Sequence, residues 1–311
     1  MRSLHGLRIF CSSHGMIELM NEVVVYVALV LFGAAFGSFA AATVWRLRAR
    51  QLVADKAAGE PYDKKEYKRL KKIIAKPLHD HSQCLHCSYK LKWYDLLPIV
   101  SWLSLKGKCR NCRKPIGWFE FLMELSVAAY FVLSYAFWPG GLGTGLEVTH
   151  FVLWLVAGVI MAMLFAYDAK WFLLPDKLNS ALAIVGVGIV GVVATQTGDI
   201  VGTIVGALAS VAILSGLYGM LYFVSKGRWV GFGDVKLGVG LALILVDWQL
   251  ALVALFMANF IGCLIVIPLL ATKKIARNAH VPFGPLLIAG TITALFFGQT
   301  ILDAYLSVLG L

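Results

Sequence analysis

Residues 165–176 read FAYDAKWFLLPD, and residues 231–238 read GFGDVKLG. Each segment places one aspartate, Asp168 or Asp234, at the edge of an apolar stretch long enough to cross a lipid bilayer. A carboxylate is expensive to desolvate in this position, so an acid there marks a functional site by default. The two segments therefore indicate both the fold class and the place to look for chemistry.

The composition is that of a membrane protein. The chain has 311 residues, of which 59% are hydrophobic and 14% charged, and its mean hydropathy is +0.79. Runs of about 20 apolar residues match a hydrocarbon core of roughly 30 Å. They occur near 22–44, 119–138, 150–167, 178–196, 200–224, 250–271 and 284–309, and a shorter run at 235–246 follows Asp234. We expect an all-α polytopic protein with about eight transmembrane helices.

The positive charge follows the predicted spans. The net charge is +11, and 26 of the 28 Lys and Arg residues lie in four segments: 46–118, 168–177, 225–236 and 272–283. The intervening loops 139–149, 197–199 and 247–249 have none. The positive-inside rule places the four basic segments in the cytoplasm and both termini outside. Topology thus explains the charge, with membrane lipids and no nucleic acid as the expected partner.

The amino terminus fits this topology poorly. Arg2 and Arg8 lie in a polar stretch without the apolar core of a signal peptide. We expect translation to start at Met16 or Met20, which would also remove Cys11.

The spans and loops predict three parts: residues 1–45 with the first transmembrane helix, a cytoplasmic basic and cysteine-containing loop at 46–118, and a transmembrane domain at 119–311. Residues 46 to about 76 are rich in charge, which predicts a solvated helix or helical hairpin near the membrane.

Two C-x-x-C pairs lie in the second part of that loop. Cys84 and Cys87 are separated from Cys109 and Cys112 by 21 residues, a spacing close to that of zinc ribbons. Four thiolates can meet at one tetrahedral point, and on the reducing cytoplasmic side thiols are available for metal. A structural zinc site in a small zinc-ribbon-like insert is the prediction, with a redox pair or unliganded thiols as alternatives.

Other potential ligands have plainer interpretations. Four cysteines fill the zinc shell, so His86 is interpreted as a spacer, and His79 and His81 as solvated. Cys263 lies within an apolar run and is interpreted as a small membrane-buried residue.

Paired aspartates can hydrolyse a peptide bond. One ionised carboxyl activates water while a protonated one polarises the carbonyl, and two carboxyls held close together share a proton in this way. The acids at 199, 247 and 303 fall on the predicted outer face and are excluded. Asp176 follows Pro175 and is interpreted as a helix N-cap. Asp168 and Asp234 remain as the candidate pair of an aspartyl protease.

Two glycines precede Asp234. Gly231 and Gly233 leave room for an extended substrate backbone to approach the acid, and they permit unusual dihedral angles in the enzyme backbone. We expect both to contribute to substrate binding.

The chain resembles the type IV prepilin peptidases, bifunctional leader peptidases and N-methyltransferases whose peptidase half belongs to the GxGD membrane aspartyl proteases. The resemblance runs along most of the sequence. It rests on GSF at 37–39, WRL at 45–47, the two cysteine pairs with LPIVSWLSLKGKCR at 97–110, Glu120 and Glu124, Asp168 with PD at 175–176, GFGDVKL at 231–237, and PFGP at 282–285.

This resemblance implies a function and a place in the cell. Asp168 and Asp234 correspond to the catalytic pair, Gly231 and Gly233 to the motif glycines, and the four cysteines to the zinc module of bifunctional members. The implied activity is cleavage of the basic leader of type IV pilin or pseudopilin precursors at the cytoplasmic face of the bacterial inner membrane. N-methylation of the new amino terminus with S-adenosyl-L-methionine follows.

Two departures from the family pattern stand out. Ala41 lies near a position where the family usually has Asn, which puts in doubt a role of the first span in methyl transfer. The insert at 50–76 is also longer and more basic than the family core. The methyltransferase half rests on resemblance alone, with Glu120, Glu124 and the cysteines as the place to look. A carboxylate in the first turn of a helix is also favoured by the helix dipole.

Two other classes of function remain open. The same aspartates could relay protons in a proton-coupled transporter, although no internal repeat of the spans is evident. A membrane scaffold that docks a partner through its zinc module is the third possibility.

The glycines at 33 and 37 are interpreted as a helix-packing face. Phe283, between two prolines, is a candidate for the lining of the cleft at the aspartates.

Overall fold

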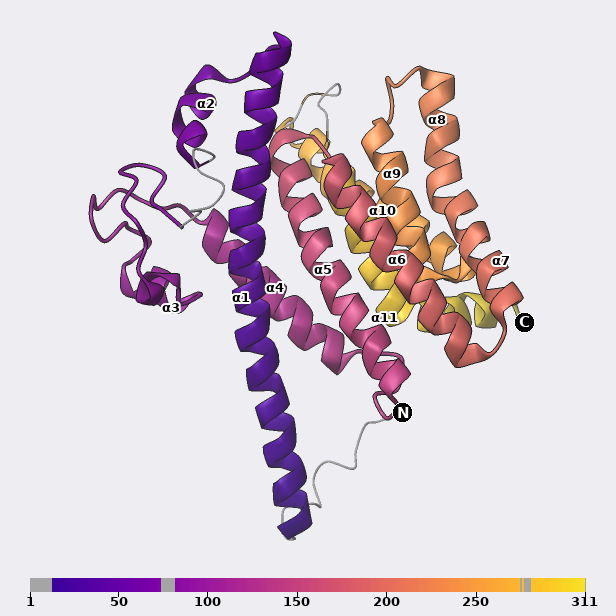
Figure 1. Ribbon diagram of the computed structural model, residues 1–311. Helices are drawn as coiled ribbons and strands as arrows, with labels where there is room; N and C mark the ends of the chain where they lie inside the picture. Colours follow the sequence, from indigo (N-terminus) through magenta and orange to yellow (C-terminus); the bar gives the residue numbers. More distant parts are fainter. Residues whose placement is uncertain (1–12, 74–81, 275, 277–280, 311) are drawn as a thin grey trace. The chain divides into compact units, whose positions relative to one another are not determined.

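The computed structural model describes residues 13–73, 82–274, 276 and 281–310. Within these residues the regular elements are helices, with two isolated β-bridges and no strand, so the all-α prediction is confirmed (Figure 1). The expectations for Arg2, Arg8, Cys11, His79 and His81 lie outside the described residues.

Seven helical segments in the described part of the chain are long and apolar enough to cross a membrane. They are α1 (Ser13–Ala58), α4 (Phe119–Ala136), α5 (Gly145–Trp171), α6 (Asp176–Thr197), the α7–α8 rod (Ile200–Val211 and Leu217–Ser225), α10 (Trp248–Ala271) and α11 (Gly284–Leu309). A π-helical turn, Ala212–Gly216, joins α7 to α8.

The remaining helices are shorter. Helix α9 (Phe232–Leu245) corresponds to the short apolar run predicted at 235–246, the sixth of the eight predicted spans in chain order. With 14 residues it rises about 21 Å, less than a hydrocarbon core of roughly 30 Å. The prediction of about eight transmembrane helices is therefore met by seven full-length helices and one short one. The chain also forms α2 (Lys64–Leu70), α3 (Val100–Ser104) and two 3-10 turns, Lys71–Ile73 and Trp93–Leu96.

The chain divides into two compact units. Unit 1 comprises residues 1–42 and 78–136, and unit 2 comprises residues 43–77 and 137–311, so α1 contributes to both. In unit 1, α1 packs on α4 through two glycines. A Cβ at Gly33 would lie 2.7 Å from Ala128 Cα, and one at Gly37 would lie 2.6 Å from Glu124 Cα. The predicted packing face is confirmed, because any side chain there would push the helices apart.

In unit 2 the short helix α9 is surrounded by longer ones. It contacts α6, α7, α8, α10 and α11, and α10 packs along α11. Leu237, Leu241 and Ala242 of α9 are fully buried. Because its neighbours cover it, α9 does not need to match the bilayer thickness by itself.

Both ends of α9 are inset relative to the α7–α8 rod. A Cβ at Gly206 would lie 2.8 Å from the carbonyl oxygen of Val246, where α9 ends. At the other end, Ser215 Oγ donates a hydrogen bond of 2.9 Å to the Val235 carbonyl. Since α8 continues to Ser225, ten residues beyond Ser215, and α9 begins three residues before Val235, the start of α9 lies roughly 10 Å short of the end of that rod at about 1.5 Å per residue.

The basic segment after the first span forms a helical hairpin. Helix α1 continues to Ala58, the chain turns at Gly59, and Asp63 caps α2 by accepting the N–H groups of Lys65 and Glu66 at 2.7 and 3.0 Å. The predicted hairpin is confirmed. It is not simply solvated, because Leu52 of α1 and Leu70 at the end of α2 are buried.

Candidate active site and metal centre

Asp168 lies in the last turn of α5. It is 5% exposed, and its Oδ2 accepts the backbone N–H of Gly284 at 3.0 Å. Helix α5 ends three residues later, at Trp171, because Phe172 adopts a left-handed conformation and donates its N–H to the Asp168 carbonyl at 2.9 Å. The carboxyl group is thus fixed between the end of α5 and the start of α11.

Asp234 lies in the first turn of α9. Its Oδ2 accepts the backbone N–H of Gly231, the N-cap residue, at 3.2 Å. A carboxylate in this turn is also favoured by the helix dipole. The α9 boundary therefore follows from the sequence GFGD, in which the acid stabilises the helix that positions it.

The glycines provide room and not unusual backbone angles. A Cβ at Gly284 would lie 2.8 Å from Asp168 Oδ2, and one at Gly233 would lie 3.0 Å from the Cβ of Leu174. Gly231 has an ordinary extended conformation, with φ −77° and ψ 149°, and Gly233 is not among the residues with positive φ. The expectation of unusual dihedral angles was therefore wrong, because the constraint at Gly233 is the close approach of Leu174.

The two aspartates converge at one end of unit 2. Helices α6 and α11 each contact both α5 and α9, and Leu174 lies beside Gly233 as well as beside Gly284. Leu174 therefore joins the first turn of α9, which carries Asp234, to the residue that donates to Asp168. Sequence separation is large, so this proximity is a product of the packed helices and not of a local motif.

Tyr218 of α8 also belongs to this neighbourhood, although sequence reasoning missed it. Its side chain is buried, its ring centre lies 5.0 Å from that of Phe283, and Asn259 Nδ2 donates to its hydroxyl at 3.5 Å. Phe283 directly precedes Gly284, the residue that donates to Asp168. A single tyrosine in an apolar span carries no sequence signal, whereas Phe283 was a candidate because of its neighbouring prolines.

Asp176 does not cap α6. The helix begins at Asp176 itself, Pro175 occupies the N-cap position, and no side chain caps it. The Asp176 carboxylate instead forms an exposed ion pair of 2.7 Å with Lys236 Nζ of α9. The predicted N-cap was wrong because the residue after Pro175 is already helical, and the ion pair ties the start of α6 to the first turn of α9.

The four predicted cysteine ligands come together in unit 1. Their sulfur atoms all lie within 4.8 Å of one another, and Cys84–Cys112 and Cys87–Cys109 are 3.9 Å apart. A tetrahedral zinc with Zn–S bonds of about 2.3 Å requires S–S distances of about 3.8 Å, so the cysteines fit the ion. His86 is exposed and outside the cluster, consistent with a spacer.

The two cysteine loops have the same geometry. In each loop the backbone N–H of the first Cys, Cys84 or Cys109, donates to a carbonyl of the same loop, and its own carbonyl accepts a backbone N–H from that loop. A β-bridge closes each loop, between Gln83 and Lys90 in the first and between Lys108 and Pro115 in the second. The backbone N–H of Tyr89 lowers the pKa of Cys87 to about 6, whereas burial raises the pKa of the Cys84 thiol.

Beside the loops, Asp95 forms an ion pair of 2.7 Å with Arg110 and raises the pKa of that guanidinium. We call residues 82–117 the Cys module.

Glu124 is a second feature of unit 1. It is 7% exposed, accepts the backbone N–H of Ile99 at 2.7 Å, and is hydrogen-bonded to Ser38 of the GSF segment. Ile99 has φ 62°, a strained conformation for a β-branched residue. Glu120 lies in the first turn of the same helix, α4. A buried carboxylate that holds a strained backbone is a candidate functional group.

Comparison with known proteins covers most of the chain. Residues 31–138 match the Bacterial Peptidase A24 N-terminal domain, and residues 155–267 match the Type IV leader peptidase family. Two prepilin leader peptidase/N-methyltransferases are similar. The enzyme of Aeromonas hydrophila is 31% identical over 229 residues, which are 73% of this chain and 74% of the relative. The enzyme of Stutzerimonas stutzeri is 29% identical over 230 residues, which are 73% of this chain and 75% of the relative.

A third relative is aligned over a longer stretch. It is the type 4 prepilin-like proteins leader peptide-processing enzyme of Escherichia coli O78:H11, 28% identical over 273 residues, which are 85% of this chain and 91% of the relative. No solved structure matches the chain.

Proposed function

Because the chain belongs to the type IV leader peptidase family, we propose that it cleaves the leader of type IV pilin-like precursors and then methylates the new amino terminus. The observation that carries the peptidase half is the convergence of Asp168 and Asp234 at one end of unit 2. Each carboxyl group has one oxygen held by a backbone N–H, from Gly284 and Gly231 respectively.

The chemistry follows from two carboxyl groups that share one proton. The ionised group takes a proton from water as the water attacks the scissile carbonyl, and the protonated group donates to the carbonyl oxygen. The proton taken from water then passes to the amide nitrogen as the C–N bond breaks and the carbonyl re-forms. The backbone N–H groups of Gly231 and Gly284 orient the carboxyls during this exchange. We assign Gly231, which is exposed, to contact with the extended substrate backbone.

The depth of Asp234 indicates how the substrate enters. Val235, the residue after Asp234, lies at the level of the π-helical turn, so Asp234 lies below the end of α8. An extended backbone at that depth needs a protein-lined or wet cleft. We infer that the apolar segment of the precursor lies beside the spans, while its basic leader remains in the cytoplasm on the side of the basic loops. The protein is then a multi-pass protein of the inner membrane.

The Cys module is assigned to a structural zinc ion held by Cys84, Cys87, Cys109 and Cys112. Such an ion stabilises a loop whose described residues form two isolated β-bridges and no strand. S-adenosyl-L-methionine supplies the methyl group when bound, and we place its recognition in unit 1, near Glu120 and Glu124. The buried Glu124 carboxylate orders the backbone at Ile99, where the module joins the first span and α4.

A reconstitution assay tests this function. Purified protein in lipid vesicles is mixed with a pilin-like precursor, and mass spectrometry follows loss of the leader and gain of a methyl group. Cleavage followed by methylation is the expected result. Proton uptake driven by a pH gradient, with no cleavage, would contradict the proposal and favour a proton relay through the same aspartates.

The cytoplasmic orientation has a separate test. Lys226→Cys and Gly143→Cys, each made in a background without other cysteines, place single thiols in a basic loop and in an opposite loop. An impermeant thiol reagent added to intact cells should label only the thiol at position 143. Labelling at position 226 from outside would overturn the orientation.

A further inference from the structure

A hollow of about 460 Å³ lies where the α1–α2 hairpin meets the end of α5, entirely within unit 2. It is lined by Arg48, Asp63, Lys65, Glu66, Arg69, Lys170 and Trp171. Its volume falls in the range of ligand pockets, about 300–1,000 Å³. We call it the basic cleft. It is distinct from the Cys module and from the aspartate pair, and the function proposed above does not use it.

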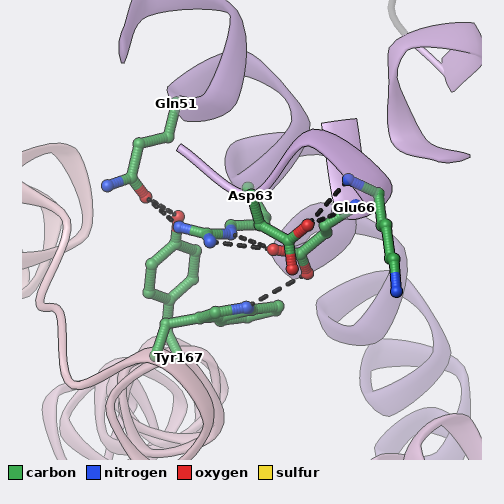
Figure 2. Close-up of polar contacts among 7 residues, drawn as sticks. Gln51, Asp63, Glu66 and Tyr167 are labelled. Carbon is green, nitrogen blue, oxygen red and sulfur yellow. Dashed lines mark hydrogen bonds and ion pairs between the residues drawn. The ribbon is translucent and has the colours of Figure 1, made fainter. Parts of the chain in front are cut away.

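A hydrogen-bonded frame holds the walls of the cleft. Arg48 donates from both Nε and Nη2 to Glu66 Oε2, at 2.9 and 2.8 Å, and Trp171 Nε1 donates to Glu66 Oε1 at 3.1 Å. The hydroxyl of Tyr167 donates to Gln51 Oε1 (Figure 2). The hairpin and the end of α5 are therefore joined by side chains from three helices.

Positive charge converges on two indole rings in this frame. Lys170 Nζ lies 3.7 Å from the centre of the Trp45 ring, and the Arg69 guanidinium lies 5.2 Å from the same centre. These two cations are thus at most about 9 Å apart, close to the Debye length of about 8 Å at physiological salt. Lys170 and Arg48 converge in the same way on Trp171, at 4.8 and 5.2 Å.

The acids of the cleft are already engaged in the frame. Both oxygens of Glu66 accept hydrogen bonds, from Arg48 and Trp171. Asp63 accepts the N–H groups of Glu66 and Lys65, which hold its pKa below the usual range. Lys65, Arg69 and Lys170 are exposed. The lining thus has four cationic side chains and two acidic ones, so the hollow presents net positive charge to a ligand. The cations are Arg48, Lys65, Arg69 and Lys170.

The position of the cleft limits what the ligand can be. The apolar span formed by α5 ends at Trp171, so the cleft lies at the boundary between the hydrocarbon core and water. Tryptophan is typical of this boundary, and basic pockets beside spans bind anionic headgroups. Arginine and lysine together suit a phosphate oxygen cluster better than a neutral zwitterion.

We propose that the basic cleft binds the phosphate of an anionic phospholipid headgroup, held between Arg69 and Lys170 with Trp171 at its side. The lipid chains extend along the apolar surface of α5. Binding there fastens the hairpin to the end of α5, one helical turn from Asp168.

Native mass spectrometry tests the proposal. The full-length protein is released from phosphatidylcholine nanodiscs that contain a small fraction of phosphatidylglycerol, and retained phosphatidylglycerol is counted. Each cation near a lipid surface contributes about fivefold to binding. The variant Arg69→Gln/Lys170→Gln should therefore bind phosphatidylglycerol on the order of 20-fold more weakly than the unmodified protein.

Matched variants separate a built site from diffuse attraction. Lys177→Gln/Lys274→Gln removes the same charge outside the cleft and should retain the lipid, and Lys170→Arg should also retain it because the cation remains. Equal loss in the Lys177/Lys274 control would overturn the proposal. So would unchanged binding in Arg69→Gln/Lys170→Gln. Displacement of the lipid by millimolar inorganic phosphate would show that soluble phosphate, and not a lipid, is the ligand.

Discussion

The Cys module of unit 1 and the aspartate site of unit 2 place their functional groups by different means. In the Cys module each pair of ligands lies in one short loop whose backbone hydrogen bonds close on themselves. In the aspartate site the hydrogen bond that fixes Asp168 joins it to Gly284, which is 116 residues away. The first site is assembled by local geometry, the second by the packing of α5, α6, α9 and α11.

The difference determines what each site depends on. Local loops with little buried apolar surface depend on a bound ion for their order. Carboxyls at the ends of packed helices depend on close helix contacts, which is why glycine stands at Gly233 and Gly284. Damage to one site should therefore leave the other intact, and the predictions that follow test this independence.

The largest effect is expected in the Cys module. Cys84→Ser or Cys109→Ser removes one of four ligands, so metal content should fall from about one ion per chain to almost none. The binding free energy at stake is on the order of 10 kcal/mol. Elemental analysis of purified protein measures the metal, with Cys263→Ser as the matched control. We expect methylation to be lost before cleavage. A variant that loses metal and cleavage together, with methylation retained, would contradict the independence of the two sites.

The next effect concerns the packing at Asp168. A methyl group at Gly284 would lie 2.8 Å from Asp168 Oδ2, so Gly284→Ala must displace that carboxyl group. A misplacement on the order of 1 Å can cost about 100-fold in rate, and we expect cleavage to fall by up to that factor. Single-turnover cleavage measures it. Gly191→Ala is the control, because a Cβ there meets no atom within 4 Å. An unchanged rate for Gly284→Ala would show that the Gly284 contact does not position Asp168.

A stability effect is expected at the hairpin. Arg48 and Glu66 are only 11% and 14% exposed, and removal of one partner leaves the other charge uncompensated. Arg48→Met should reduce the free energy of unfolding by about 3 kcal/mol. Unfolding in mixed micelles measures the change, with the exposed Arg50→Met as control. Equal stability of the two variants would show that the pair contributes little.

The smallest effect is expected at the exposed ion pair between α6 and α9. Asp176 and Lys236 have 71% and 38% exposed side chains, so solvent screens their attraction. Asp176→Asn should change the free energy of unfolding by less than about 1 kcal/mol and leave cleavage nearly unchanged. The same unfolding and cleavage assays apply. A loss of cleavage as large as that of Asp234→Asn would mean that Asp176, and not Asp168, is the partner of Asp234.

Local patterns in the sequence predicted the most. The spacing of Cys84, Cys87, Cys109 and Cys112 was enough to predict their cluster, since each pair is held by its own loop. The apolar runs predicted the helices for the same reason, because length and hydropathy are local properties. Asp168 and Asp234 could be selected as exceptions within those runs.

Features that depend on tertiary packing could not be predicted. Neither Tyr218 nor the inset position of α9 has a local signal, since both arise from contacts among distant helices. The N-cap expected at Asp176 failed because α6 already begins at this residue, whose carboxylate pairs with Lys236 of another helix. The burial of Leu70 in the basic hairpin was likewise hidden by the charged residues around it.

The most direct test of the central claim is the rate of leader cleavage in Asp168→Asn, Asp234→Asn and the double variant. An amide cannot take a proton from water, so each single variant should lose on the order of 10⁴-fold or more. The double variant should lose no more than either single one, because the two residues act as one unit. Metal content and methylation of precleaved substrate should be unchanged in all three. Substantial cleavage by either single variant, or losses that multiply in the double variant, would contradict the account.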